Sequence, residues 1–142
     1  MIEIKKKDSF YRNFVVEGNP VGKARPRMTR EGHVYTVDKT KAYEQLIRIM
    51  YRQKYHGEPK ATGNVSIEIR ITISVPKSAT KKERQVLLSA RPMKKPDLDN
   101  VAKIFLDALN GVAYEDDKQV TSLTVYREWG ENPQVEVWIL GG

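Results

Sequence analysis

Apolar and polar residues alternate without a break over residues 65–75, with an apolar side chain at every odd position. Because successive side chains of a strand point to opposite faces, this pattern predicts a strand with one buried and one solvated face. Four other β-prone runs predict further strands at residues 12–17, 33–37, 119–129 and 134–140. The turn residues at 130–133 predict that the last two strands form a hairpin.

A first helix is predicted to begin at Asp38, a residue type that can cap a helix. Apolar residues recur at i, i+3, i+4, i+7 and i+8, which places them on one side of a helix. The predicted inward-facing residues are Tyr43, Leu46, Ile47, Met50 and Tyr51. Arg48 and Arg52 are expected to face solvent.

Two further helices are predicted after the strand at 65–75. Ser78 or Thr80 can cap a short charged helix that reaches about residue 90. The other helix covers about residues 98–110 and closes on Gly111, which suits the left-handed conformation after a helix end. The expected inward-facing residues are Val86 and Leu87 in the former and Leu98, Val101, Ala102, Phe105 and Leu109 in the latter.

These elements define an α+β fold, with a mixed, mostly antiparallel sheet of four to five strands packed with two or three helices. The length of 142 residues fits one domain, residues 1–142, built around a single core.

The chain contains no cysteine, which excludes disulfides, thiolate zinc sites and cysteine nucleophiles. Its two histidines leave little room for histidine-rich metal sites. No run of about 18 apolar residues occurs, and the first residues lack the apolar stretch of a signal peptide. We therefore expect a soluble, cytoplasmic protein without a membrane partner.

Charge is distributed unevenly along the chain. Residues 1–96 contain 22 Lys and Arg against 9 Asp and Glu, whereas residues 97–142 contain 3 against 9. The two parts carry net charges of +13 and −6, which give the +7 of the whole chain. A basic surface attracts phosphate backbones, so a nucleic-acid partner is predicted. The candidate phosphate contacts are Lys23, Arg25, Arg27, Lys94 and Lys95, with solvated surface charge as the alternative for each.

Aspartates cluster around the last predicted helix. Pro96 marks the helix start, which places Asp97 at or near the N-cap and Asp99 in the first turn, where both can turn toward a common point. Asp116 or Asp117, in the loop before the next strand, can complete a set of three carboxylates. Oxygen ligands without His or Cys favour Mg²⁺ or Mn²⁺, so a metal site is predicted.

Each of these residues also has a simpler explanation. Asp97 can cap the helix, and Asp99 can form an ordinary i, i+4 ion pair with Lys103, one turn further on. Asp116 and Asp117 can be turn residues. The convergence of all three features at the ends of one short helix favours a functional site.

Several motifs occur in order between about residues 14 and 120, and they are Gly18-Asn19-Pro20 with Lys23-Ala24-Arg25-Pro26-Arg27, Lys95-Pro96-Asp97-Leu98-Asp99-Asn100 with Lys103, Asp107-Ala108-Leu109-Asn110-Gly111, and Asp116-Asp117-Lys118-Gln119-Val120. In these motifs the chain resembles the RusA family of Holliday-junction resolvases, which are endonucleases of phages and bacteria.

The resemblance implies a RusA-like fold and roles for particular residues. Asp97, Asp99 and Asp117 match the family's essential aspartates, Asp116 neighbours them in the same motif, and Lys103 matches the catalytic lysine. It also implies a Mg²⁺-dependent homodimer that resolves four-way DNA junctions by paired nicks in recombination and repair, with Mn²⁺ as an expected substitute. Mg²⁺ held by carboxylates can activate water and stabilise charge on a phosphodiester, which agrees with that chemistry.

Two other functions remain open for the same residues. One is a non-catalytic, basic DNA-binding accessory protein in which the aspartates are structural. The other is a nuclease for other branched DNA, which would share the site and differ in substrate. Trp129, Trp138 and Tyr126 are expected to be core or interface residues rather than platforms for base stacking.

Overall fold

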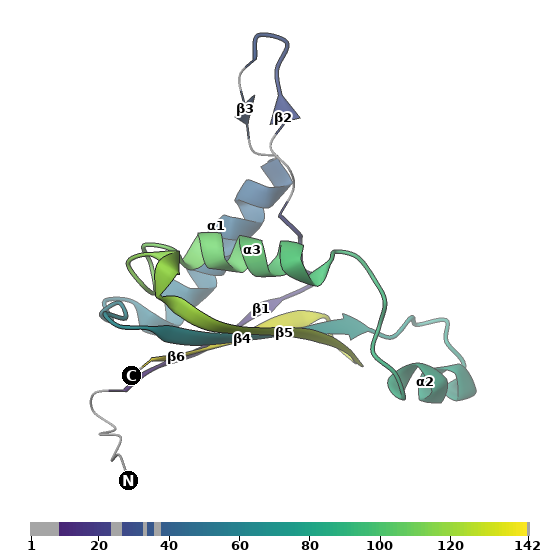
Figure 1. The fold of residues 1–142 in the computed structure, drawn as a ribbon. Coiled ribbons are helices and arrows are strands. Elements are labelled where there is room, and N and C mark those ends of the chain that lie inside the picture. The colour runs from purple at the N-terminus through teal and green to yellow at the C-terminus, as the bar shows by residue number, and fades with distance from the viewer. Residues whose placement is uncertain (1–8, 24–26, 33, 36–37, 142) are drawn as a thin grey trace.

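The computed structural model describes residues 9–23, 27–32, 34–35 and 38–141. Its elements, in chain order, are β1 (Phe10–Glu17), β2 (Arg27–Met28), β3 (Val34–Tyr35), α1 (Asp38–Tyr55), β4 (Val65–Ser74), α2 (Lys81–Leu88), α3 (Leu98–Leu109), the short 3₁₀ helix η2 (Asp117–Gln119), β5 (Val120–Gly130) and β6 (Gln134–Gly141). Helices α1 and α3 lie over the same face of one sheet, and β2 and β3 form a small hairpin that projects away from it (Figure 1).

The main sheet has the strand order β1-β6-β4-β5. β6 pairs antiparallel with both β1 and β4, whereas β5 pairs parallel with β4. The predicted α+β class and the mixed, mostly antiparallel sheet are therefore confirmed. In the described part of the chain, no helix has the length and apolar character needed to cross a membrane.

The predicted hairpin between the last two strands is wrong. β5 and β6 do not pair, because β4 lies between them: Ser74 is paired with Gly130 on one side, and Thr72 with Gln134 on the other. The residues at 131–133 therefore cross over the end of β4. A Cβ at Gly130 would lie 2.4 Å from Cγ2 of Thr72, so a larger residue here would require the Thr72 side chain to move.

The core lies between the sheet and the two helices. The apolar positions of β4 are all buried, and they face α1 and α3. In α3 the predicted Val101, Ala102, Phe105 and Leu109 are buried and Leu98 is partly buried, while Ile104 and Ala108 add to the core beyond the prediction. Phe105 packs edge-on against Tyr43 of α1, with ring centroids 5.9 Å apart. Gly111 has the predicted left-handed conformation, with φ of 78°.

Three helical positions differ from the prediction. Leu46 is 37% exposed, whereas Tyr43, Ile47 and Tyr51 are buried on the inner side of α1 and Met50 is partly buried against the core. Val86 is 65% exposed, and α2 has no buried residue because it lies beyond the end of the sheet rather than over it (Figure 1). Arg48 does not simply face solvent, since its Nε donates a hydrogen bond of 3.1 Å to the carbonyl of Ala108 and so joins α1 to α3.

Replacement of Phe105 by alanine is expected to lower the free energy of unfolding by about 3 to 5 kcal/mol, because it leaves a cavity where α1, α3 and the sheet meet. Phe105→Leu keeps most of the apolar volume and is expected to cost less. Urea unfolding followed by circular dichroism measures both. A loss below about 1 kcal/mol for Phe105→Ala would show that this ring does not join the three elements.

Candidate nucleic-acid cleft and carboxylate site

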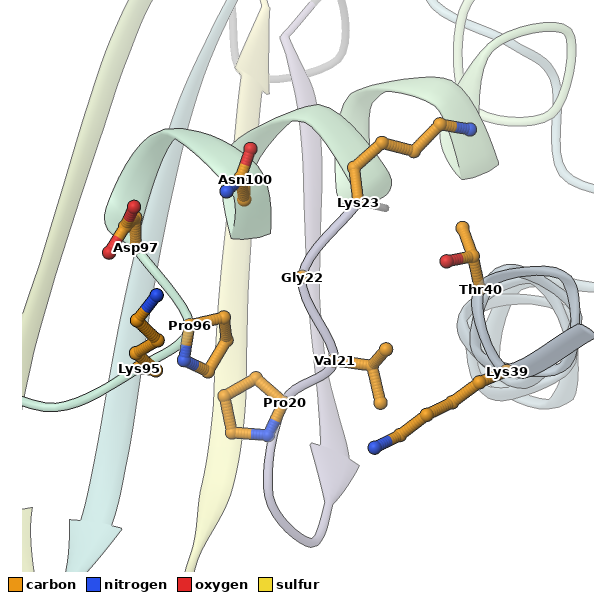
Figure 2. A pocket seen from close by; sticks show the side chains of 10 residues that line it. All are labelled: Pro20, Val21, Gly22, Lys23, Lys39, Thr40, Lys95, Pro96, Asp97 and Asn100. Carbon is orange, nitrogen blue, oxygen red and sulfur yellow. The ribbon is translucent and has the colours of Figure 1, made fainter. Parts of the chain in front are cut away.

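A cleft of about 400 Å³ lies between the segment that follows β1, the start of α1 and the start of α3 (Figure 2). Its lining residues are Pro20, Val21, Gly22, Lys23, Lys39, Thr40, Lys95, Pro96, Asp97 and Asn100. Three lysines thus surround a space with a single carboxylate, Asp97, in its wall. This is a cationic recess directly beside the first of the predicted site aspartates.

The segment 20–23 is seated tightly against the start of α3. The backbone N–H of Lys23 donates a hydrogen bond of 2.9 Å to the carbonyl of Asn100. A Cβ on Gly22 would lie 2.7 Å from Cβ of Pro96 and 3.1 Å from Cβ of Asn100, closer than side chains pack. Gly22 is therefore required by contact with α3, and this contact closes one side of the cleft.

Lys23 differs in environment from the other lysines of the cleft. Its Nζ is paired with the carboxylate of Glu44 and lies 3.2 Å from Oδ2 of Asp107. Partial burial acts to lower the pKa of Lys23, but the hydrogen bonds and charges of these two carboxylates outweigh it and raise the pKa above its ordinary value. The ammonium group predicted to contact phosphate is thus engaged in joining the segment 20–23 to α1 and α3.

The other predicted phosphate contacts are in different situations. Lys95 lines the cleft, whereas Nζ of Lys94 lies over the ring of Trp129, 5.7 Å from its centroid. Arg25 falls outside the described residues. Arg27 begins β2, in the projecting hairpin.

The segment that leads into α3 is fixed along the later half of β5. Arg91 lies over the ring of Tyr126, 5.2 Å from its centroid, and donates a hydrogen bond of 3.1 Å to the carbonyl of Arg127. Arg127 in turn donates one of 3.3 Å to the carbonyl of Pro96, the residue before Asp97. These contacts set the position of the α3 start. Each of the three aromatic rings thus has a cation over it: Arg91 over Tyr126, Lys94 over Trp129, and Arg70 over Trp138, 5.3 Å from the ring centroid.

Asp97 and Asp99 stand at the start of α3 with exposed carboxylates. Asp97 occupies the N-cap position, as predicted, but its side chain accepts no capping hydrogen bond. Asp99 is in the first turn, and no ion pair joins it to Lys103, which is exposed one turn further on. The Asp97 side chain therefore does not cap the helix, and Asp99 does not form the i, i+4 ion pair. Neither of the two simpler explanations applies. Both carboxylates are available to a ligand.

Asp116 and Asp117 form a second acidic group, at η2. Oδ1 of Asp116 accepts a hydrogen bond of 2.9 Å from the backbone N–H of Lys118, within a capping box that includes Gln119. This hydrogen bond, with another from the Asp117 carboxyl, lowers the pKa of Asp116. The same carboxyl contact raises the pKa of Asp117, helped by slight desolvation and by the charges of Asp116 and Asp107. Asp116 is thus a turn residue, as its simpler explanation predicted.

The two acidic groups lie toward opposite ends of α3. Asp107, whose charge acts on Asp117, is eight residues beyond Asp99 on α3, which corresponds to about 12 Å along the helix axis. Within the described ranges, no three Asp, Glu or His side chains are gathered in a way that could hold a metal ion. A single copy of the chain therefore does not assemble the predicted three-carboxylate set, although the donor type fits Mg²⁺ or Mn²⁺.

An α+β domain that places free carboxylates beside a lysine-lined cleft has the arrangement expected of proteins that act on nucleic-acid backbones. The family model "Endodeoxyribonuclease RusA" matches residues 17–140, nearly the whole chain, and the chain belongs to this family. Membership implies endodeoxyribonuclease activity with branched DNA as the substrate class. The chain is also similar to "Uncharacterized protein YqaN" of Bacillus subtilis (strain 168), with 39% identity over 133 residues, which cover 89% of this chain and 93% of that protein.

Sequence reasoning missed Lys39 and Arg127 as parts of this region. Lys39 directly follows the predicted cap Asp38, but no pattern in the chain indicates that the start of α1 faces the start of α3. Arg127 lies between Tyr126 and Glu128 in a predicted strand, and this local sequence gives no sign of its hydrogen bond to the carbonyl of Pro96. Both depend on tertiary contacts between elements far apart in the sequence.

Gly22→Ala is expected to destabilise the protein by about 1 to 3 kcal/mol, because the added methyl group meets Pro96 and Asn100 and forces the segment away from α3. Gly63→Ala is the matched control, since a Cβ at Gly63 meets nothing within 4 Å. It is expected to leave stability unchanged or to raise it by up to about 1 kcal/mol. Equal effects of the two substitutions on urea unfolding would contradict the tight seating of Gly22.

Proposed function

We propose that this protein is a Mg²⁺-dependent endodeoxyribonuclease that resolves four-way DNA junctions by symmetric paired nicks in recombination and repair. The observation that carries the proposal is the pair of carboxylates, Asp97 and Asp99, that stand free at the start of α3 beside a lysine-lined cleft. Family membership, which implies endodeoxyribonuclease activity, supports it.

The side chains have distinct proposed roles. Asp97, Asp99 and Asp117 would hold Mg²⁺, or Mn²⁺ in its place, and the metal would supply activation of water and stabilisation of charge on the phosphate. Lys103, exposed on the Asp99 side of α3, would neutralise the negative charge that develops on the phosphoryl oxygens. Asp116 would act mainly by fixing η2 and so the position of Asp117.

We propose a homodimer as the active form, because a four-way junction requires two matched cuts and a twofold dimer presents two identical sites. The position of β5 at the edge of the sheet supports this. One side of β5 pairs with β4, and no described strand pairs with its other side. An apolar groove that contains Leu106, Leu123 and Val125 lies next to this open edge, and Asp99 and Lys103 are at its rim. A second copy covering the groove would bury it and bring two sites together.

The same dimer would explain why Asp97 and Asp99 lie at one end of α3 and Asp117 lies toward the other. The segment that ends at Pro96 lies along the later half of β5, while Asp117 directly precedes β5. If two copies meet antiparallel along the open edge, the start of β5 in one copy comes beside that segment in the other. Asp117 would then approach Asp97 of the partner subunit, and each metal site would be completed by both copies.

Asp99→Asn is expected to lower the rate of junction cutting by about 100-fold or more while leaving junction binding intact, because it removes a metal ligand without changing side-chain volume. The assay uses a labelled synthetic four-way junction with a mobile core, excess linear duplex as competitor, and either Mg²⁺ or EDTA. Paired, symmetric, Mg²⁺-dependent nicks are the expected wild-type result.

Glu83→Gln is the control for this substitution, because Glu83 is also an exposed carboxylate in the first turn of a helix, α2. It is expected to cut as the wild type does. Retained cutting by Asp99→Asn would refute the assignment. Wild-type binding without cutting in Mg²⁺ or Mn²⁺ would support the non-catalytic accessory protein instead, and nicks in flaps but not in four-way junctions would support a nuclease for other branched DNA.

Mixing inactive Asp99→Asn and Asp117→Asn copies is expected to restore cutting, because in a mixed dimer one composite site has all its wild-type aspartates. Single-strand nicks in the mixture, absent from either variant alone, are the measurement. If each site lies within one chain, both sites of every mixed dimer remain defective and the mixture stays inactive.

Substitution of a residue in the groove provides a separate test of the dimer. Leu123 is 42% exposed in the groove, and Leu123→Asp is expected to shift the mass measured by light scattering from dimer toward monomer. Leu140, 48% exposed on β6, lies away from the groove, and Leu140→Asp is expected to leave the mass unchanged. A monomeric wild type would overturn the dimer proposal.

A further inference from the structure

We propose that the cleft between α1 and α3 binds the phosphodiester backbone of DNA next to the cutting site, through Lys39 of α1 and Lys95 of the segment before α3. This inference rests on DNA as the substrate of the proposed function, and it adds a backbone-binding site with a new residue, Lys39. The cleft is shared by elements that are more than 50 residues apart in the sequence.

The available positive charge in the cleft comes from Lys39 and Lys95. Of the cleft lysines, Lys23 is paired with Glu44 and Asp107, whereas neither Lys39 nor Lys95 forms an ion pair with any residue in the described part of the chain. Figure 2 shows the two side chains entering from different elements, with Lys95 next to Asp97. Two unneutralised ammonium groups against one lining carboxylate favour an anionic ligand.

The shape and walls of the cleft fit a nucleic-acid backbone. Pro20, Val21 and Pro96 supply apolar wall, against which the carbons of a deoxyribose can lie while the phosphate oxygens meet the lysines. Backbone phosphates are commonly held in this way, and such contacts fix the register of the strand without reading its sequence. A wholly polar recess would be less suited to a sugar.

The cleft is also held in a fixed form. The hydrogen bond from Lys23 N–H to the Asn100 carbonyl and the ion pairs of the Lys23 side chain hold the segment 20–23 to both helices. Lysines on a fixed frame lose less freedom on binding than lysines on a mobile loop. Because Asp97 forms part of the wall, a strand seated in the cleft continues directly toward the carboxylates at the start of α3.

The experiment compares two double variants with the same change in net charge. Lys39→Ala/Lys95→Ala removes the cleft pair, whereas Lys41→Ala/Lys77→Ala removes two exposed lysines that do not line the cleft and are not among the predicted phosphate contacts. Junction affinity is measured by fluorescence anisotropy in EDTA over a range of salt concentrations. The thermal unfolding temperature of both variants is also measured, and a value equal to that of the wild type shows that they are folded.

The cleft variant is expected to bind more weakly and to reduce the slope of log K against log salt by about 2, since each lost phosphate contact on duplex DNA removes about 0.9. The control variant, Lys41→Ala/Lys77→Ala, is expected to change the slope by clearly less. Equal slopes for the two variants, or wild type that does not bind DNA, would overturn the proposal.

This measurement separates the cleft from the proposed cutting activity, because it is made without a divalent metal. A cleft-dependent slope in a protein that never cuts would leave the binding site standing and refute the nuclease. If the wild type cuts junctions but the two variants have equal slopes, the nuclease stands and the binding site in the cleft is refuted.

Discussion

Burial of one face of β4 fixes where the side chains of the candidate site on α3 lie. The odd-numbered residues of this strand are buried along its whole length, and the strand pairs on both sides, with β5 and with β6. Their apolar surface must be covered, and α1 and α3 cover it together. Because six side chains of α3 are buried in this contact, the helix has little freedom to rotate or slide. Asp97, Asp99 and Lys103 are thereby held on its exposed side.

Polar contacts between the helices then shape the region around the start of α3. Lys23 joins Glu44 of α1 to Asp107 of α3, and Arg48 donates to the carbonyl of Ala108. Such contacts are only partly shielded from water, so each contributes modestly to stability. Their main effect is geometric, because they hold the segment 20–23 against α3 and leave a cleft between the two helices.

The charged residues divide into those already satisfied within the chain and those left free. Lys23 and Asp116 have partners that account for them, as does Lys94, which lies over Trp129. Asp97 and Lys95 line the cleft, and neither forms an ion pair with any residue that the structure describes. An exposed, unpaired charge costs the folded protein little, and it remains available to a ligand of opposite sign. In the proposed function, the free carboxylates would hold the metal and the free lysines would hold the DNA backbone.

The sequence by itself determined most of the elements and the family, because both depend on local pattern. Alternation over residues 65–75 gave β4, helical spacing with Pro96 and Gly111 gave α3, and the aspartate motifs gave the family. Tertiary structure decided what local pattern does not encode. The turn at 130–133 has the same residues whether β6 pairs with β5 or crosses β4, and only competition for the edges of β4 selects the crossover. Likewise, the placement of Lys39 and Lys95 in the lining of one cleft, and the pairing of Lys23 with two carboxylates, arise from packing between distant segments.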